Sequence, residues 1–258
     1  MGLDFSNMST QFIKRVALIT GAGQGIGRAI AQALAADGAV TVVNDVDRAR
    51  AERVVAEIIA AGSQAVAIVA DVSRHEAVEA MVAAIVQRFE RLDILVNCAR
   101  VEPPRPNGMS DDEWWDRVLA VDLKGAYLCA MAAWGHMQRH QFGRVINISS
   151  VQGVLGKADD EWIAYSCAKA GMFGLTRSLA QRGMRQGITA NAVAPDYIET
   201  EVMQARWGQK KLDAMATSVP IGRAGRPDDV ADAVLFLTQA SFITGETIFV
   251  NGGRFVLP

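Results

Sequence analysis

Short runs of apolar and β-branched residues alternate along the chain with longer segments in which apolar residues recur every three or four positions. The short runs are typical of strands buried on both faces of a parallel sheet, and the longer segments of helices that turn one face to a core. We expect strands at residues 16–20, 41–44, 65–69, 94–96, 144–149, 189–194 and 247–250. We expect helices at residues 26–36, 49–61, 75–89, 111–140, 163–185 and 227–238.

This alternation builds βαβ crossovers, so the predicted fold class is α/β, a doubly wound parallel sheet with helices on both faces. The chain has 258 residues, 50% of them hydrophobic, and residues 1–258 are expected to form a single domain. Two helix starts are marked, by a Ser110 and Glu113 capping box and by Pro227 in a first turn. The irregular stretches 100–108 and 196–226 are expected to form the walls of a ligand site.

Charge and cysteine usage narrow the choice of partners. The formal net charge is -2 and the basic residues are scattered, which favours a small-molecule ligand over a nucleic acid or an anionic membrane. The three cysteines lie far apart without a Cys-x-x-Cys pair, so we expect reduced thiols and no metal site. Residues 1–12 lack the pattern of an export signal, and the expected location is the cytoplasm.

A glycine-rich turn between the first strand and the first helix is the clearest candidate for ligand binding. Gly21, Gly25 and Gly27 fit the spacing Gly-x-x-x-Gly-x-Gly, with Gln24 and Ile26 between them. Glycines let the backbone approach a pyrophosphate closely, and the free amides and dipole of the following helix attract its charge. The sequence therefore predicts a dinucleotide site.

Two carboxylates after the next strands bear on the choice of dinucleotide. Asp45 stands where a carboxylate accepts hydrogen bonds from ribose hydroxyls and repels a 2′-phosphate, so NAD is expected over NADP. Arg48 and Arg50, close by, argue the other way. Asp71, followed by Val72, either bonds the adenine amino group or caps the next helix.

Tyr165 and Lys169 are the strongest candidates for catalysis. Residues four apart share one helical face, so the ammonium is expected beside the phenol. A nearby cation stabilises the phenolate, which brings the phenol closer to the range in which it exchanges a proton at neutral pH.

With Thr-Gly-x-x-x-Gly-Ile-Gly, Asp71-Val72, Asn147-Ile148-Ser149-Ser150, Tyr-x-x-x-Lys and Pro195 with Thr200 in this order, the chain resembles the short-chain dehydrogenase/reductase superfamily. The match covers about residues 16–253. The run 195–200 and the ending 244–253 look like the branch that includes 3-oxoacyl carrier-protein reductases and NAD-linked secondary-alcohol and polyol dehydrogenases. The resemblance implies a Rossmann-like sheet and a homotetramer with dihedral symmetry.

The resemblance also implies roles for single residues. Tyr165 is the expected acid and base, and Lys169 the expected partner of the nicotinamide ribose. Ser150, or alternatively Ser149, is expected to bond the reacting oxygen. The remaining coenzyme contacts are expected from Asn97, Pro195, Ile198 and Thr200, the last two at the nicotinamide carboxamide.

The chain departs from the family pattern at four places. Arg100 replaces a glycine, and it either anchors an anionic substrate or turns to solvent. Asp122 replaces the asparagine of the proton relay; it substitutes for that residue, pairs with Lys169, or is satisfied by Lys124 or a water. The loop before Tyr165 is about two residues longer, and its acidic residues 159–161 are expected to border the substrate and to suit hydroxyls or a cation. Asp196 replaces the glycine after Pro195.

These features together predict an NAD-dependent oxidoreductase that transfers hydride between nicotinamide and a secondary alcohol or lactol carbon of a sugar, polyol or hydroxy acid, with sugars and polyols favoured. The alternatives are an NADPH-dependent 3-oxoacyl carrier-protein or CoA-ester reductase, and a catalytically impaired dinucleotide-binding protein. Substrate contacts are expected from Arg100, Trp162, Tyr197 and Trp207.

Overall fold

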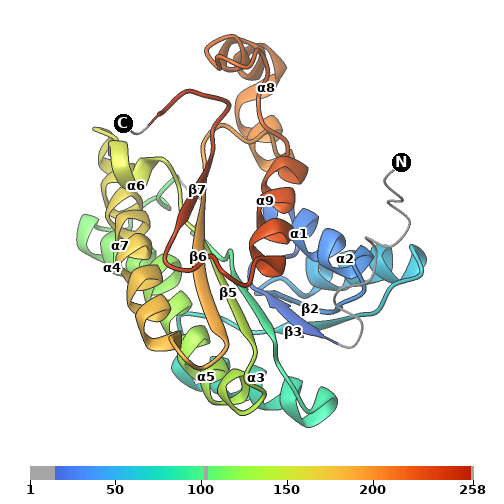
Figure 1. The fold of residues 1–258 in the computed structure, drawn as a ribbon. Coiled ribbons are helices and arrows are strands. Elements are labelled where there is room, and N and C mark those ends of the chain that lie inside the picture. Colours follow the sequence, from blue (N-terminus) through green and yellow to red (C-terminus); the bar gives the residue numbers. More distant parts are fainter. Residues whose placement is uncertain (1–14, 102–103, 257–258) are drawn as a thin grey trace.

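Seven parallel strands form one sheet in the computed structural model, which describes residues 15–101 and 104–256 (Figure 1). The order across the sheet is β3-β2-β1-β4-β5-β6-β7. The chain therefore leaves β1 in one direction, returns, and continues from β4 in the other, which opens a crevice at the carboxyl ends of β1 and β4. The strands are β1 (Val16–Ile19), β2 (Val40–Asp45), β3 (Ala65–Val69), β4 (Ile94–Asn97), β5 (Gly143–Ile148), β6 (Ile188–Pro195) and β7 (Thr247–Val250).

Helices cover both faces of this sheet, and the predicted fold class is confirmed. One face is covered by α1 (Gly25–Ala36), α2 (Arg48–Ala60) and α9 (Pro227–Gln239). The other is covered by α3 (His75–Phe89), α5 (Gly125–Arg139) and α7 (Asp160–Gly183). Each layer buries a separate apolar core, around Ile30 and Val234 on the first face and around Ile85 and Met137 on the second. Burial of such side chains is the main stabilising term of the fold.

Four further elements refine the sequence prediction. The helix expected at 111–140 is three elements, α4 (Asp111–Leu119), a π-helical turn η2 (Ala120–Lys124) and α5, with the capping box at Ser110 as expected. A short helix α6 (Gln152–Leu155) follows β5. The stretch 196–226, expected to be irregular, contains α8 (Glu201–Ala216) above the sheet (Figure 1). The N-cap residue of α8 is Thr200, whose hydroxyl accepts a hydrogen bond from the Met203 amide at 3.3 Å.

The continuous run from α4 to α5 is long and apolar enough to cross a membrane by length and composition, with a mean hydropathy of 1.3. In this fold the apolar side of the run packs inside the protein, because Ala130, Ala133 and Met137 are fully buried in the core shared with α3 and the sheet. Residues 1–12, in which the sequence shows no export signal, lie outside the described residues.

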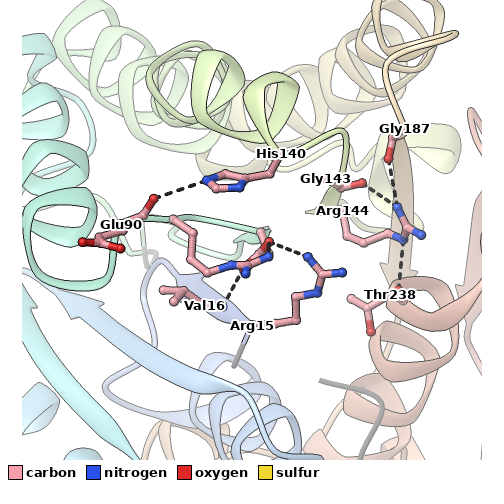
Figure 2. Close-up of polar contacts among 10 residues, drawn as sticks. Arg15, Val16, Glu90, His140, Gly143, Arg144, Gly187 and Thr238 are labelled. Atoms are coloured by element: carbon pink, nitrogen blue, oxygen red, sulfur yellow. Dashed lines mark hydrogen bonds and ion pairs between the residues drawn. The ribbon is translucent and has the colours of Figure 1, made fainter. Parts of the chain in front are cut away.

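The amino ends of the strands carry a cluster of charges that we call the amino-end cluster: Arg15, Arg91, Asp93 and Arg144. Figure 2 labels Arg15 and Arg144 in this cluster. Asp93 is fully buried just before β4. Its carboxylate accepts hydrogen bonds from the Val16 amide at 2.9 Å, from Arg15 at 3.0 Å and twice from Arg91 at 2.7 Å. Four donors around two oxygens satisfy this carboxylate.

Arg144, at the start of β5, completes the cluster without a carboxylate partner within the described residues (Figure 2). Its guanidinium donates to the carbonyls of Thr238 at 3.0 Å, Gly143 at 2.8 Å and Gly187 at 3.3 Å. Arg144 and Arg15 also lie over the ring of Phe142, at 4.3 and 3.8 Å from its centroid. Burial, aided by the Arg15 charge, lowers the pKa of Arg144. Because the Thr238 carbonyl lies in the last turn of α9, this cation stabilises a helix end.

Candidate active site

A cleft of about 1050 Å³ opens at the carboxyl ends of the strands, opposite the amino-end cluster. It gathers most of the residues that the sequence singles out. Those lining it are Gly21, Gln24, Gly25, Ile26, Gly27, Asp45, Asp71, Val72, Arg100, Ser149, Ser150, Trp162, Tyr165, Lys169, Pro195, Tyr197, Ile198, Thr200 and Trp207. Two other candidates, Asn97 and Asp122, are buried behind its wall.

The glycine turn has a shape that side chains would fill. Gly21 and Gly25 have φ values of 62° and 52°, in the left-handed region that favours glycine. A Cβ at Gly27 would come within 2.3 Å of the Gly21 carbonyl oxygen. Helix α1 starts here at Gly25, and its N-cap residue, Gln24, makes no side-chain cap. The first amides of α1 are thus left for an anion, and the turn fits the pyrophosphate of a dinucleotide.

Asp45, at the end of β2, is fixed against this turn. One carboxylate oxygen accepts a hydrogen bond from the Gly23 amide at 3.0 Å, and the other from the Asp47 amide at 3.0 Å. A Cβ at Gly23 would lie 2.6 Å from the first of these oxygens, so the turn and the carboxylate fit together. Arg50 also lines the cleft and is paired with Asp47 at 3.2 Å.

Asp71 lies at the cleft after β3, but it does not cap the next helix. Its carboxylate accepts hydrogen bonds from the amide and hydroxyl of Ser73, at 2.9 and 2.7 Å. The N-cap residue of α3 is Arg74, so the capping alternative is wrong. Val72 is buried against Gly125, where a Cβ would come within 2.8 Å of the valine methyl.

Tyr165 and Lys169 lie side by side on α7, as their spacing predicts. The Lys169 Nζ is 5.4 Å from the centroid of the Tyr165 ring, and only 2% of Lys169 and 8% of Tyr165 is exposed. The ammonium donates to the Ile148 carbonyl at 3.1 Å. Trp162 packs edge-on against Tyr165 with centroids 5.4 Å apart. Within the described residues no hydrogen-bond partner occupies the phenol oxygen, so it is available to a ligand in the cleft.

The two serines after β5 have different surroundings. Ser149 donates its hydroxyl to the Lys169 carbonyl at 2.7 Å and so ties α7 to the strand. Ser150 accepts from the Gln152 amide at 3.2 Å, and its oxygen is 3.4 Å from the Pro195 carbonyl. The long second contact leaves the Ser150 proton only weakly engaged. This geometry favours Ser150 over Ser149 as the donor to a substrate oxygen.

Asp122, in the π-helical turn, faces Lys169 rather than Lys124. One carboxylate oxygen accepts a hydrogen bond from the Val101 amide at 2.7 Å. The other is 3.4 Å from the Lys169 Nζ and accepts no hydrogen bond within the described residues. Burial raises the pKa of Asp122, and the Lys169 charge opposes that rise. Of the alternatives for Asp122, the structure therefore shows the pairing with Lys169, as a loose contact between two buried groups.

Beneath the cleft floor, a chain of polar side chains crosses from β4 to α7. Asn97 donates to the Asn147 side chain at 2.9 Å, and Asn147 donates to the Thr176 hydroxyl at 2.9 Å. Asn97 thus holds neighbouring strands together at the cleft. Next to it, burial raises the pKa of Cys98 to about 11, which keeps this thiol protonated at neutral pH.

The part of the cleft lining around Trp162 and Trp207, which we call the mouth, contains residues that the sequence did not single out. Lys157, Arg206 and Lys211 line it beside Trp162 and Trp207. The Lys157 Nζ lies 3.9 Å from the Trp162 ring centroid, and the Lys211 Nζ 5.0 Å from that of Trp207. The spacing of Trp207 and Lys211 provides no signal for this pair, because α8 is interrupted between them at Gly208, where the rule for side chains four residues apart on a helix does not apply.

The acidic residues of the loop before α7 do not border the cleft, contrary to expectation. Asp159 caps α7 by accepting a hydrogen bond from the Glu161 amide at 3.2 Å. Asp159, Asp160 and Glu161 are all absent from the cleft lining, to which the same loop contributes Lys157. At the other wall, Asp196 is paired with Arg254 at 2.9 Å. The orientation of the helix start turns the acidic residues away from the site.

Comparison with known proteins supports the resemblance. Residues 21–254 match the family model described as enoyl-(acyl carrier protein) reductase. The chain is 40% identical over 242 residues to (2S)-((R)-hydroxy(phenyl)methyl)succinyl-CoA dehydrogenase subunit BbsD of Thauera aromatica, covering 93% of this chain and 96% of that one. It is 40% identical over 243 residues to 3-oxoacyl-(acyl-carrier-protein) reductase FabG of Staphylococcus aureus strain Mu50, covering 93% and 98%.

A third relative, cis-4-hydroxycyclohexanecarboxylate dehydrogenase of Sinomonas cyclohexanicum, is 39% identical over 249 residues, covering 95% of this chain and 98% of the relative. These matches span nearly the full length of each protein, at an identity that implies common descent and a shared type of reaction. The chain belongs to the short-chain dehydrogenase/reductase superfamily, in the branch that includes 3-oxoacyl carrier-protein reductases, and is an NAD(P)-dependent oxidoreductase.

Proposed function

We propose that this enzyme transfers hydride reversibly between NAD and the secondary alcohol or oxo carbon of a small hydroxy or oxo acid or its thioester. The observation that carries the proposal is the pairing of Tyr165 and Lys169 in a cleft that also contains the glycine turn. A bound nicotinamide would supply the hydride acceptor or donor.

Each residue of the site would then have one task. Ser150 donates a hydrogen bond to the substrate oxygen, and Tyr165 removes the alcohol proton as the carbon loses hydride, or returns it in the reverse direction. The buried Lys169 cation stabilises the phenolate form of Tyr165 and keeps protons free for ribose hydroxyls, since its own contacts are one carbonyl and the loose Asp122 pair. Asp122 completes the group as a relay or as a modulator of Lys169.

The remaining coenzyme contacts would follow the shape of the cleft. Gly21, Gln24, Gly25, Ile26 and Gly27 would hold the pyrophosphate. Pro195, Ile198 and Thr200 would hold the nicotinamide end, and Asp71 with Val72 the adenine. Asn97 would have an indirect role, since its hydrogen bond to Asn147 holds β4 beside β5 under the cleft.

NAD is the proposed coenzyme because of Asp45. Its carboxylate is held at the turn by two backbone amides, where it would accept from ribose hydroxyls and repel a 2′-phosphate. Of the two arginines nearby, Arg48 pairs with Glu52 outside the cleft lining and Arg50 pairs with Asp47. Neither is held in place for a phosphate by the fold alone. The rival is NADPH-dependent reduction of a 3-oxoacyl thioester; the name of the FabG relatives favours that substrate and does not specify the coenzyme.

The substrate class follows from the charge of the cleft. On the substrate side of Tyr165, the described lining contains Arg117, Lys157 and Lys211, while the one carboxylate among those described residues, Asp196, is paired with Arg254. This surface suits an anion better than a sugar or polyol, which the sequence favoured. Three relatives are named for a CoA thioester, a carrier-protein thioester and a cyclic carboxylate, all of them anionic substrates.

We also propose that the chain acts as a single domain in a cytoplasmic homotetramer. Large apolar side chains stand out on the helices that cover one face of the sheet, including Tyr127 on α5 and Ile163 on α7, which are 49% and 45% exposed. A second copy would cover such residues. Light scattering that shows a monomer at micromolar concentration would reject the tetramer.

The test is a panel of hydroxy acids, CoA thioesters, cyclic alcohols, sugars and polyols with NAD and with NADP, read by absorbance of the reduced coenzyme. We expect turnover of acids or thioesters, with kcat/KM higher for NAD than for NADP. A clear preference for NADP overturns the coenzyme assignment. Tight NADH binding without turnover of any member overturns hydride transfer and favours a dinucleotide-binding protein.

A further inference from the structure

The mouth of the cleft is built differently from the coenzyme end. Around the glycine turn, the charged lining residues are Asp45, Asp71 and Arg50, of both signs. At the mouth, the loop before α7 contributes Lys157 and α8 contributes Arg206 and Lys211. The chain as a whole has a net charge of -2, so a local excess of cations runs against its overall balance.

Two of these cations, Lys157 and Lys211, lie over aromatic rings. Lys157 lies over Trp162 at 3.9 Å and Lys211 over Trp207 at 5.0 Å. Such cation–π contacts orient an ammonium without neutralising its charge, as a carboxylate would. Neither lysine forms an ion pair with a carboxylate within the described residues, so both keep their charge for a ligand.

Both cation–ring pairs belong to the lining of one cleft, one from the loop before α7 and its first turn and the other from α8. Burial lowers the pKa of Lys157, and the carboxylates of Asp159 and Glu161 oppose this. The charges of Arg206 and Lys211 add to the lowering. Cations on the loop and on α8 are therefore close enough to repel one another when no anion lies between them. An anion placed there would relieve that repulsion.

Trp162 contacts both Lys157 and Tyr165, the residue proposed to transfer the proton. One side of its indole meets Tyr165 at 5.4 Å between centroids, and its face meets Lys157 at 3.9 Å. A substrate whose carbinol or oxo carbon reaches Tyr165 would thus lay an apolar portion along the indole and bring its far end to the lysines.

We propose that Lys157 and Lys211 form an anion subsite, one indole away from Tyr165, that selects hydroxy or oxo compounds with a negative group remote from the reacting carbon. This inference rests on the proposed function and narrows it. The negative group is a carboxylate or the phosphate of a pantetheine carrier, which share the chemistry that an ammonium pair recognises.

The test compares matched substrates in the reductive direction with NADH. One pair is 4-oxocyclohexanecarboxylate and its methyl ester, and the other is acetoacetyl-CoA and the acetoacetyl thioester of N-acetylcysteamine, which has no phosphate. In the wild-type enzyme we expect kcat/KM to favour the anionic member of at least one pair by about tenfold or more. The pair that shows the preference identifies the carboxylate or the phosphate as the group bound.

The variant Lys157→Gln/Lys211→Gln should lower this anionic-to-neutral ratio by about tenfold, mainly through KM. Lys210→Gln is the matched control, because Lys210 is exposed on α8 next to Lys211 but does not line the cleft, and it should keep the wild-type ratio. Equal kcat/KM for charged and neutral members, or a ratio unchanged in the double variant, would overturn the subsite alone. No reduction of any member with NADH or NADPH would overturn the subsite together with the proposed function.

Discussion

Each end of the sheet buries a carboxylate next to cations, but the two carboxylates differ in how many hydrogen bonds they accept. At the amino end, Asp93 accepts four hydrogen bonds from two arginines and a backbone amide. At the carboxyl end, Asp122 accepts one short hydrogen bond and faces Lys169 at 3.4 Å. Both are almost fully buried, so burial alone does not distinguish them.

The two regions differ in how much hydrogen-bonding capacity their buried polar groups leave unused. Because a buried polar network is rigid when every member is satisfied, the amino-end cluster acts as a fixed joint between β1, β4, β5 and α9. Around Lys169 and Tyr165, hydrogen-bonding capacity is left for a ligand, at some cost to the free protein. A carboxylate at the amino end should therefore matter for stability, and one at the carboxyl end for turnover.

The sharpest test of the carboxyl end is Tyr165→Phe, which removes the hydroxyl and keeps the ring against Trp162. We expect kcat to fall by about a thousandfold while NADH affinity stays within about threefold, because a general acid and base contributes roughly 10²–10⁴ in rate. Steady-state kinetics and NADH fluorescence titration measure the two effects. If the variant keeps more than about a tenth of kcat, Tyr165 is not the proton-transfer group.

At the amino end, Asp93→Ala should produce the largest loss of stability, about 3 kcal/mol in the free energy of unfolding. It strands Arg15 and Arg91 and removes the acceptor of the Val16 amide, although the arginines are partly exposed and regain some hydration. Urea denaturation measures the loss. The kcat of the remaining folded enzyme should be near wild type, and a large loss of kcat with unchanged stability would reverse the comparison.

Asp122→Asn tests how the loose carboxyl-end pair sets the pH dependence. Burial raises the pKa of Asp122, but above that pKa its negative charge cancels part of the Lys169 charge. Asparagine carries no charge at any pH, so Lys169 would stabilise the Tyr165 phenolate unopposed. The rising limb of alcohol oxidation against pH should then move down by about one pH unit. Profiles that superimpose would show that this carboxylate does not act on proton transfer.

The smallest effect is expected from Ser149→Ala, which removes a hydroxyl that already has a hydrogen-bond partner within the protein. Loss of the hydrogen bond to the Lys169 carbonyl should cost about 1 kcal/mol in the free energy of unfolding. KM for the coenzyme should change by less than about threefold, because the Lys169 side chain keeps its own partners. A collapse of kcat on the scale of the Tyr165 variant would instead make Ser149 the serine that bonds the substrate.

Sequence periodicity predicted the sheet and its covering helices because those elements bury long apolar faces. It missed α8, whose only buried residue is Leu212, so no amphipathic pattern marks it. The glycine turn and the Tyr165–Lys169 pair were predictable because their chemistry depends on local spacing. The contacts of Asp93 with Arg15 and Val16 were not, because they join residues 78 and 77 apart in the chain.

The orientation of side chains in the site was the least predictable part. The run 157–162 contains Lys157 and three acidic residues, and composition alone suggested that it presents negative charge to the substrate. The cap at Asp159 fixes where α7 begins, and this start places Lys157 and Trp162 at the cleft with the carboxylates outside. Only the direction in which the loop enters the helix decides the sign of the charge that the substrate meets.

Gly208 interrupts α8 with a φ of 69° and a ψ of 160°, so that this element is two short helical pieces joined at one residue. The inner piece grows from the Thr200 cap beside the coenzyme site, while the outer piece holds Lys211 and Leu212. If Lys211 serves the proposed anion subsite, exchanging the outer piece, residues 209–216, for that of another enzyme would change substrate choice and leave Thr200, the proposed nicotinamide contact, in place.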